Sequence, residues 1–211
     1  MTPERSEKFQ NVLSQRQADL AIVMENVHDP HNISAVMRTC DAVGIQDIYV
    51  INSKIPKHAY FGPKSSSSAA KWLTVHQFTT LEDCIPVLKL RYNKIYTTHL
   101  SADAVQLYEV DFTKESIALV FGNEHDGVSE AMRNHADGNI IIPQVGMIQS
   151  LNISVACAIS IYEAFRQKQI AGHYQQPSLS QERIQEIRAV WSKPKVKFRF
   201  KDLRALRKST Q

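Results

Sequence analysis

Three groups of polar residues each follow a stretch of apolar residues that is typical of a buried β-strand. The groups are His31-Asn32 with Arg38, Gly122-Asn123-Glu124 with Gly127, and Ser150 with Asn152. Parallel strands end at one edge of a sheet, and open α/β sheets bind their ligands at that edge. The three groups can therefore converge into one polar site, and their joint occurrence favours a functional role.

Each group also has an ordinary explanation when it is taken alone. Ser150 is a common helix-capping residue, Asn152 can be a solvated residue of a first helical turn, and Arg38 can be a solvated helix residue. Several other chemistries are excluded by their motifs, since the chain has no GxxxxGK[ST], GxGxxG, GxSxG or HExxH. Its eight histidines lack metal-ligand spacing, so no metal is expected.

The segment from Ile140 to Ile161 joins a strand, a tight turn and a helix. The β-branched run 140–142 suits a buried strand, Pro143 ends it, and Gly146 lets the chain fold back. Apolar residues at helical spacing then predict a helix from about residue 151. The residues with this spacing are Leu151, Val155, Ala158, Ile159 and Tyr162.

The rest of the chain alternates predicted strands and helices. Strands are expected at 20–24, 47–51, 72–78, 94–98 and 117–121, and helices at 6–16, 33–43, 81–90, 129–135 and 183–191. Pro30 is expected to prevent a helix before Asn32. The Ser-rich run in 53–70 predicts a mobile loop. This alternation predicts an α/β fold with a mostly parallel sheet and helices on both faces.

Length, charge and cysteine content narrow the class of protein. The 211 residues suit one α/β domain with short appendages. No window is apolar enough to span a membrane and the start is charged, so a soluble cytoplasmic protein is expected. Cys40, Cys84 and Cys157 are widely spaced and are expected to be reduced packing residues.

Positive charge is concentrated near the C-terminus. Residues 193–208 hold eight basic residues against one acidic residue, a net +7, so the rest of the chain is net −3. This distribution favours a polyanion such as nucleic acid, with a solubilising tail as the alternative. The candidate RNA-binding residues are Arg5, Arg16, His31, Arg166, Lys168, Lys195, Lys197 and Arg199.

Three motifs resemble those of a known family. They are HNISAVMRT (31–39), LVFGNEHDGVS (119–129) and IPQVGMIQSLNISVACAI (142–159). They look like the motifs of the SpoU/TrmH family of SPOUT RNA 2′-O-ribose methyltransferases, and the opening segment is most similar to members acting on a guanosine of the tRNA D-loop. The resemblance covers about residues 5–175 and leaves the basic end outside it.

The resemblance implies a fold with a deep C-terminal trefoil knot, a homodimer and S-adenosylmethionine as methyl donor. Simple topology rules would exclude such a knot. The implied domains are an N-terminal helix at 1–18, a methyltransferase domain at 19–172 and a helical, basic extension at 173–211. The implied cofactor contacts are His99, Leu100, Gly122, Ile142, Gly146, Met147 and Leu151. The implied catalytic residues are Asn32, Arg38, Glu124, Ser150 and Asn152.

The resemblance assigns Arg38 to activation of the ribose hydroxyl. Because arginine stays protonated under nearly all conditions, a role as general base and a role as electrostatic stabiliser of the developing alkoxide both remain open. Asn32 and Glu124 would orient Arg38, while Ser150 and Asn152 would hold the nucleotide or the loop. The alternatives are the same reaction on another tRNA nucleotide or on ribosomal RNA, and a catalytically silent RNA-binding protein.

Overall fold

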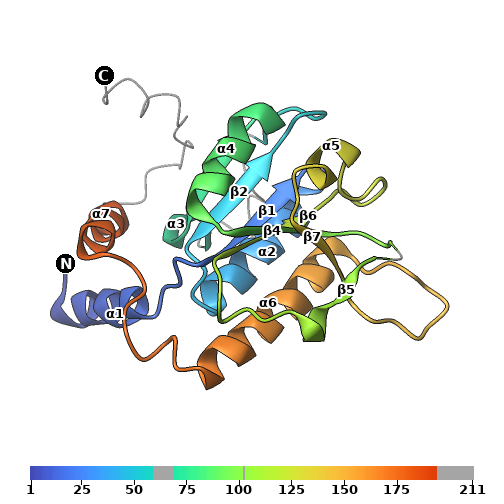
Figure 1. Ribbon diagram of the computed structural model, residues 1–211. Coiled ribbons are helices and arrows are strands. Elements are labelled where there is room, and N and C mark those ends of the chain that lie inside the picture. The colour runs from blue at the N-terminus through green and yellow to red at the C-terminus, as the bar shows by residue number, and fades with distance from the viewer. Residues whose placement is uncertain (59–68, 102, 194–211) are drawn as a thin grey trace.

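A seven-stranded sheet forms the centre of the molecule (Figure 1). The structure is a computed structural model that describes residues 1–58, 69–101 and 103–193. The strands are β1 (Leu20–Glu25), β2 (Asp47–Ile51), β3 (Thr74–Phe78), β4 (Lys94–Thr98), β5 (Val105–Gln106), β6 (Ile117–Phe121) and β7 (Gly138–Ile141). Their order is β3-β2-β1-β6-β4-β7-β5, and every strand pairing in the described part is parallel. The predicted α/β class with a mostly parallel sheet is confirmed.

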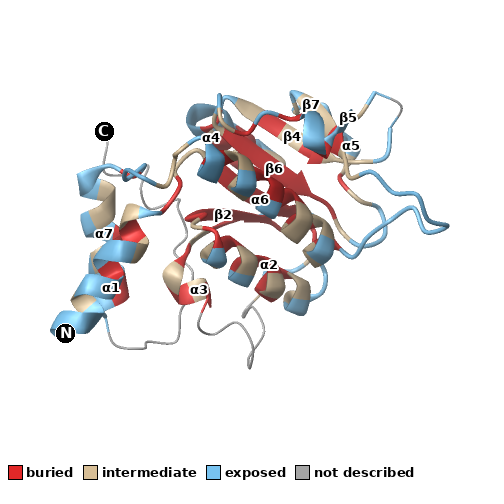
Figure 2. Cartoon of the chain, turned by 90° about the horizontal axis from the view of Figure 1, so that it is seen from below, coloured by how far each residue is buried: buried red, intermediate tan, exposed pale blue. Residues whose placement is uncertain are grey.

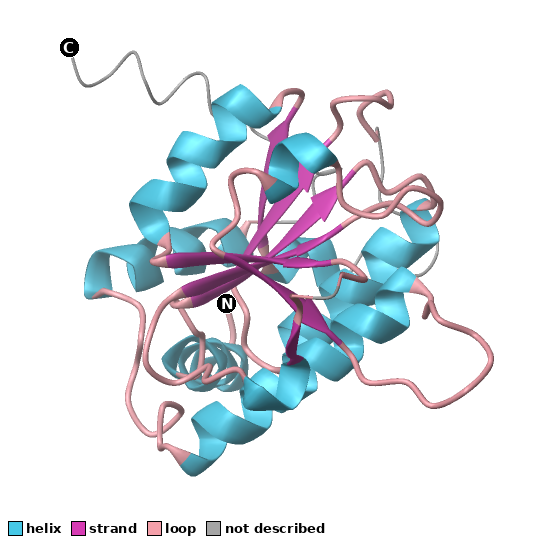
Figure 3. Cartoon of the chain, turned by 45° about the vertical axis from the view of Figure 1, so that its right-hand side comes forward, coloured by secondary structure: helices cyan, strands magenta, loops and turns pink. Residues whose placement is uncertain are grey.

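Helices cover both faces of the sheet (Figure 3). One face packs against α2 (Pro30–Ala42), α3 (Ala69–Trp72), α6 (Ile153–Ile170) and the short 3₁₀ turn η1 (Leu107–Glu109). The other face packs against α4 (Leu81–Arg91) and α5 (Glu130–Arg133). The central strands β1 and β6 are buried along their whole length (Figure 2). Because both faces of these strands are buried, their sequences are continuous apolar runs, without the alternation of apolar and polar residues seen in half-exposed strands.

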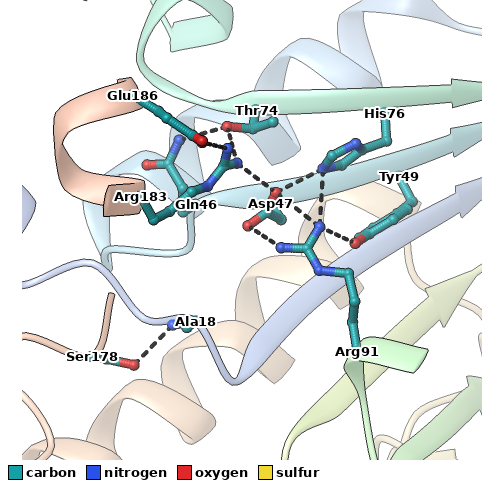
Figure 4. A network of polar contacts seen from close by, with 10 residues as sticks. All are labelled: Ala18, Gln46, Asp47, Tyr49, Thr74, His76, Arg91, Ser178, Arg183 and Glu186. Atoms are coloured by element: carbon teal, nitrogen blue, oxygen red, sulfur yellow. Dashed lines mark hydrogen bonds and ion pairs between the residues drawn. The ribbon is translucent and has the colours of Figure 1, made fainter. Parts of the chain in front are cut away.

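The two terminal helices, α1 (Pro3–Ser14) and α7 (Gln181–Ser192), pack on each other beside the sheet (Figure 2). The Phe9 and Trp191 rings lie edge to face, with centroids 5.4 Å apart. Arg183 of α7 also reaches the buried Asp47 of β2, which contacts His76 and Arg91 as well (Figure 4). Burial alone would raise the Asp47 pKa, but these positively charged and hydrogen-bonding neighbours outweigh it and lower the pKa. Helix α7 is therefore anchored to the sheet.

One sequence prediction about helices is wrong. Pro30 begins α2 instead of delaying it, because Asp29 caps the helix and a proline at the first helical position needs no hydrogen bond. The apolar residues that indicated α6 do not all lie on its buried face, since Val155 and Tyr162 are 46% and 50% exposed. The buried positions are instead Ile153, Cys157, Ile161 and Ala164.

The described residues bear on cysteines, membrane spans and metal-binding groups. All three cysteines are free and buried, as expected. None of the helices in the described part of the chain is long and apolar enough to cross a membrane. The described residues also contain no group of three or more His, Cys, Asp or Glu that could hold a metal ion. Most of the predicted Ser-rich loop (59–68) and nearly all of the basic tail, with Lys195, Lys197 and Arg199, lie outside the described residues.

Candidate active site

Side chains from all three polar groups meet at the carboxyl ends of β1, β6 and β7. The Asn32 side-chain amide donates to Glu124 Oε1 at 2.8 Å, and the Asn152 amide donates to Asn32 Oδ1 at 3.2 Å. These residues are 92 and 120 positions apart in sequence, respectively. The two bonds form one chain, Asn152 to Asn32 to Glu124, which we call the amide relay. The predicted convergence of the three groups is confirmed.

Helix starts position both amides of the relay. Asp29 accepts a hydrogen bond from the His31 main-chain N–H and caps α2, which places Asn32 in the first turn. Asn152 caps α6, and its Oδ1 accepts from both the N–H and the hydroxyl of Ser154. Because its oxygen is used in the cap, the Asn152 NH₂ group is oriented toward Asn32. Asn152 thus occupies the capping role that the sequence suggested for Ser150.

Glu124 is the acceptor at the end of the relay. Its other carboxylate oxygen accepts from the His28 main-chain N–H at 3.4 Å. Burial would raise the Glu124 pKa, but the hydrogen bonds from Asn32 and from main-chain N–H groups outweigh burial and lower the pKa. The side chain therefore stays ionised at neutral pH and holds Asn32 as a donor.

A tight glycine turn carries Glu124. Asn123 and Gly127 exchange two main-chain hydrogen bonds, and Gly127 has a φ of +67°, which favours glycine. A Cβ atom on Gly122 would lie only 1.9 Å from the Gly127 carbonyl carbon. Gly122, predicted as a cofactor contact, is thus also required by the packing of the turn.

Arg38 and Ser150 are both exposed. Arg38 lies on α2, six residues beyond Asn32, and has no hydrogen-bond or ion-pair partner within the described ranges. A guanidinium without a protein partner can bind an anion or a developing negative charge from outside. Ser150 lies in the exposed segment before the α6 cap.

The predicted cofactor contacts come from two further segments. His99 follows β4; its Nε2 lies 2.6 Å from Arg133 Nη1 and its carbonyl accepts from Asn139. Burial, together with the Arg133 charge, lowers the His99 pKa, so the ring stays neutral and accepts from Arg133. Leu100 beside it is exposed, and Ile142 is half-buried at the end of β7.

The turn between β7 and α6 has the features of a ligand-contacting loop. Val145, Met147, Ile148 and Leu151 are exposed apolar residues within seven positions. Gly146 has open space where a side chain would lie, so packing within the chain does not explain the glycine. Apolar side chains, free main-chain groups and an unobstructed glycine suit the flat adenosine of S-adenosylmethionine, so these residues fit that cofactor.

The structure separates the candidate RNA-binding residues into two sets. Arg5, His31 and Arg166 are exposed, although Arg166 is paired with Glu163. Two others are corrections, because their charged groups are buried inside the protein. Arg16 is fully buried and bonded to Asp41 and to three main-chain carbonyls, and Lys168 is 1% exposed and paired with Asp19. Both stabilise the fold and cannot reach RNA.

Three residues near the relay were missed in the sequence. His28 lies in the same polar turn as Asn32, and its ring packs edge to face with that of His125, with centroids 6.4 Å apart. Arg133 contacts His99 from α5. The turn's polarity could have indicated His28, whereas nothing in the sequence pairs residue 133 with residue 99.

Comparison with known proteins identifies the family. Residues 19–162 match the sequence profile of the SpoU rRNA Methylase family, and the chain belongs to this family. A "tRNA (guanosine(18)-2′-O)-methyltransferase" of Thermus thermophilus is 42% identical over 90% of this chain and 96% of its own length. The corresponding Escherichia coli protein is 41% identical over 82% of this chain and 75% of its own. The predicted family resemblance is confirmed.

A solved structure supports the same assignment. The crystal structure of "A. aeolicus TrmH/SpoU tRNA modifying enzyme" matches with a TM-score of 0.78 and 38% identity, and covers 89% of this chain and 94% of that one.

Proposed function

We propose that this protein transfers a methyl group from S-adenosylmethionine to the ribose 2′-hydroxyl of guanosine 18 in tRNA. The observation that carries the proposal is the amide relay, which joins the three family motifs at one edge of the sheet and includes the first turn of α2, the helix that also carries the exposed Arg38. The near full-length match to a relative named for this reaction supports the choice of substrate. The basic C-terminal residues are consistent with an RNA partner.

Each part of the site has a separate task in this proposal. S-adenosylmethionine would supply the methyl group on a sulfonium: the methyl carbon bonds to the ribose oxygen as its bond to sulfur breaks, S-adenosylhomocysteine leaves, and the hydroxyl proton is released to solvent. Arg38 binds the ribose 2′-oxygen and stabilises the negative charge that develops there. The relay fixes the first turn of α2 and so limits the positions that Arg38 can sample. Ser150, exposed beside the α6 cap, contacts the nucleotide.

The cofactor is held by the segments at 99–100, 122 and 142–151. Their main-chain groups bind the polar atoms of adenosine, and Leu100, Met147 and Leu151 cover its apolar surface. Glu124 and Asn32 remain hydrogen-bonded to each other, so they act as positioning residues. Holding the reactants in line contributes several orders of magnitude in rate, in addition to the charge stabilisation by Arg38.

We also propose that the protein is a homodimer with a knotted C-terminal segment in the methyltransferase domain, residues 19–172. The outer face of α6 carries exposed apolar residues, which a second copy would cover: Val155, Tyr162 and Ile170. Strand β7 lies between β4 and β5 in the sheet although it follows both in sequence. This order supports passage of the chain through the connection between β4 and β5.

The test uses purified protein, tritiated S-adenosylmethionine and unmodified tRNA transcript. The control transcript carries 2′-deoxyguanosine at position 18 and is otherwise identical. We expect label in the first transcript only, at a single nucleotide. Equal labelling of both transcripts, or labelling of a ribosomal RNA fragment alone, would refute the proposed substrate.

A further inference from the structure

Glu25, the last residue of β1, is a buried carboxylate that has no hydrogen bond to the described residues of the amide relay. It is 1% exposed, and both of its oxygens bind one residue. Oε2 accepts from the Ser129 N–H at 2.8 Å and Oε1 accepts from the Ser129 hydroxyl at 2.6 Å. No cation among the described residues pairs with it. Burying a carboxylate without a cation is costly, which points to a specific use of these two bonds.

The partner of Glu25 ends the turn that carries Glu124. Ser129 caps α5 through its hydroxyl, which accepts from the Met132 N–H at 3.1 Å. The turn is therefore held at both ends: by Gly122, at the end of β6, where no side chain fits, and by Ser129, which Glu25 binds, together with Val128, which is buried against the sheet. Between these ends, residues 123–127 are partly or fully exposed.

The residues after Glu25 connect β1 to the neighbouring loops. Asn26 adopts a φ of +51°, and its side chain accepts from the Lys54 N–H at 2.8 Å. The Val27 carbonyl lies 2.8 Å from His58 Nε2. The His28 N–H donates to Glu124 itself. The segment Glu25–His28 thus contacts both the loop after β2 and the turn after β6. Helix α2 begins just after this segment, at Pro30.

We propose that Glu25 is a positioning residue for methyl transfer, which acts by holding Ser129 and thereby keeping Glu124 where it accepts from Asn32. The inference rests on the proposed function. Its physical basis is the length of the Glu25 side chain, which sets the distance between β1 and Ser129 at the end of the turn. The negative charge of Glu25 itself contacts no reactant. Loss of the contact frees one end of the turn and loosens the relay.

The first test measures single-turnover transfer of tritiated methyl groups for Glu25→Ala, Glu124→Ala and the double variant. We expect Glu25→Ala to lower the rate about tenfold or more, while dissociation constants for tRNA and cofactor change by less than about threefold. In the Glu124→Ala background, adding Glu25→Ala should change the rate by less than about twofold, because both act through one contact. Equal losses in both backgrounds would overturn the inference.

Two conservative variants of Glu25 distinguish the effect of side-chain length from the effect of its charge. In Glu25→Gln the oxygen can still accept from the Ser129 N–H while the amide donates to its hydroxyl, so we expect activity within about threefold of the native protein. Glu25→Asp keeps the charge but is one methylene shorter, so it should lose activity like Glu25→Ala. If the Glu25→Asp variant is more active than the Glu25→Gln variant, positioning by side-chain length is contradicted.

A matched control removes a different buried carboxylate. Asp47→Asn acts at the amino end of β2, in the network of Figure 4, and should lower stability without selective loss of transfer rate. If the native protein methylates no tRNA, the proposed function fails. The role of Glu25 in holding the turn can still be tested, by amide hydrogen exchange. Amide exchange in residues 123–128 must then accelerate in Glu25→Ala and remain unchanged in Asp47→Asn, and equal exchange in both would refute it.

Discussion

The contact between Asn32 and Glu124 can be tested by replacing the donor with an acceptor. Asn32→Asp keeps the size of the side chain and still accepts from Asn152, so only the 2.8 Å bond to Glu124 is changed. At neutral pH that bond becomes a repulsion between two carboxylates. Asn32→Ala is the matched control, because it removes both contacts and adds no titratable group.

The size of the effect follows from two contributions. A hydrogen bond to a charged acceptor contributes about 1.5 to 3 kcal/mol, and the lower end applies because Glu124 is exposed. Repulsion between unit charges at about 4 Å adds about 1 kcal/mol in water-like surroundings and about 4 kcal/mol at an effective dielectric constant of 20. A total of at least about 2.5 kcal/mol corresponds to a loss of about seventyfold in kcat/KM.

The pH dependence gives the sharper result. In the native protein, hydrogen bonds lower the Glu124 pKa despite burial, so it is ionised across the working range. In Asn32→Asp the like charge raises the pKa of the carboxyl pair, and a proton taken up as pH falls restores a donor between them. The rate relative to the native protein should therefore rise between about pH 8 and about pH 5 for Asn32→Asp, and stay constant for Asn32→Ala.

The assay is methyl transfer to tRNA at subsaturating substrate, with circular dichroism to confirm folding at each pH. A constant ratio of the two variants across this range, or full activity of Asn32→Asp at about pH 8, would refute the assigned role of the relay.

Three other expectations follow from burial and packing. Gly122→Ala should destabilise the protein by about 1 to 3 kcal/mol in urea unfolding, because its Cβ would overlap Gly127, whereas Gly146→Ala should keep stability and weaken cofactor binding in calorimetry. Arg16→Ala breaks a buried ion pair and should cost about 3 kcal/mol, with tRNA affinity of the folded protein unchanged in filter binding; weakened affinity would restore its RNA-binding role. Tyr162→Asp should shift sedimentation from dimer to monomer, and an unchanged coefficient would contradict the proposed interface.

The sheet was predictable because its strands are short, apolar and separated by clear turns. Apolar runs as short as 20–24 and 117–121 are typical of buried strands and not of helices. The α/β class then implies that these strands pair in parallel. The site was predictable in outline because polar groups at strand ends gather at one edge. The hydrogen bonds of the site were not predictable, since Asn32 and Asn152 are 120 positions apart in sequence and meet only in the folded chain.

The predictions differ from the structure where the sequence pattern is compatible with more than one arrangement. Helix α6 is apolar on more than one face, so periodicity could not tell which face meets the sheet and which, with Val155 and Tyr162, stays exposed. Arg16 and Lys168 are buried because Asp41 and Asp19 reach them from other elements, a pairing that local sequence does not reveal. The two-residue strand β5 is too short to produce an alternation.

The central claim is best tested by mapping the methyl group to one nucleotide in native and Arg38→Ala protein. Arg38 is exposed and makes no hydrogen bond or ion pair within the described chain, so its loss should leave folding and cofactor binding intact. We expect a 2′-O-methyl group at guanosine 18 with the native protein and a loss of at least about a hundredfold in rate with the variant. A native rate in Arg38→Ala, or a methyl group at any other position, would contradict the account.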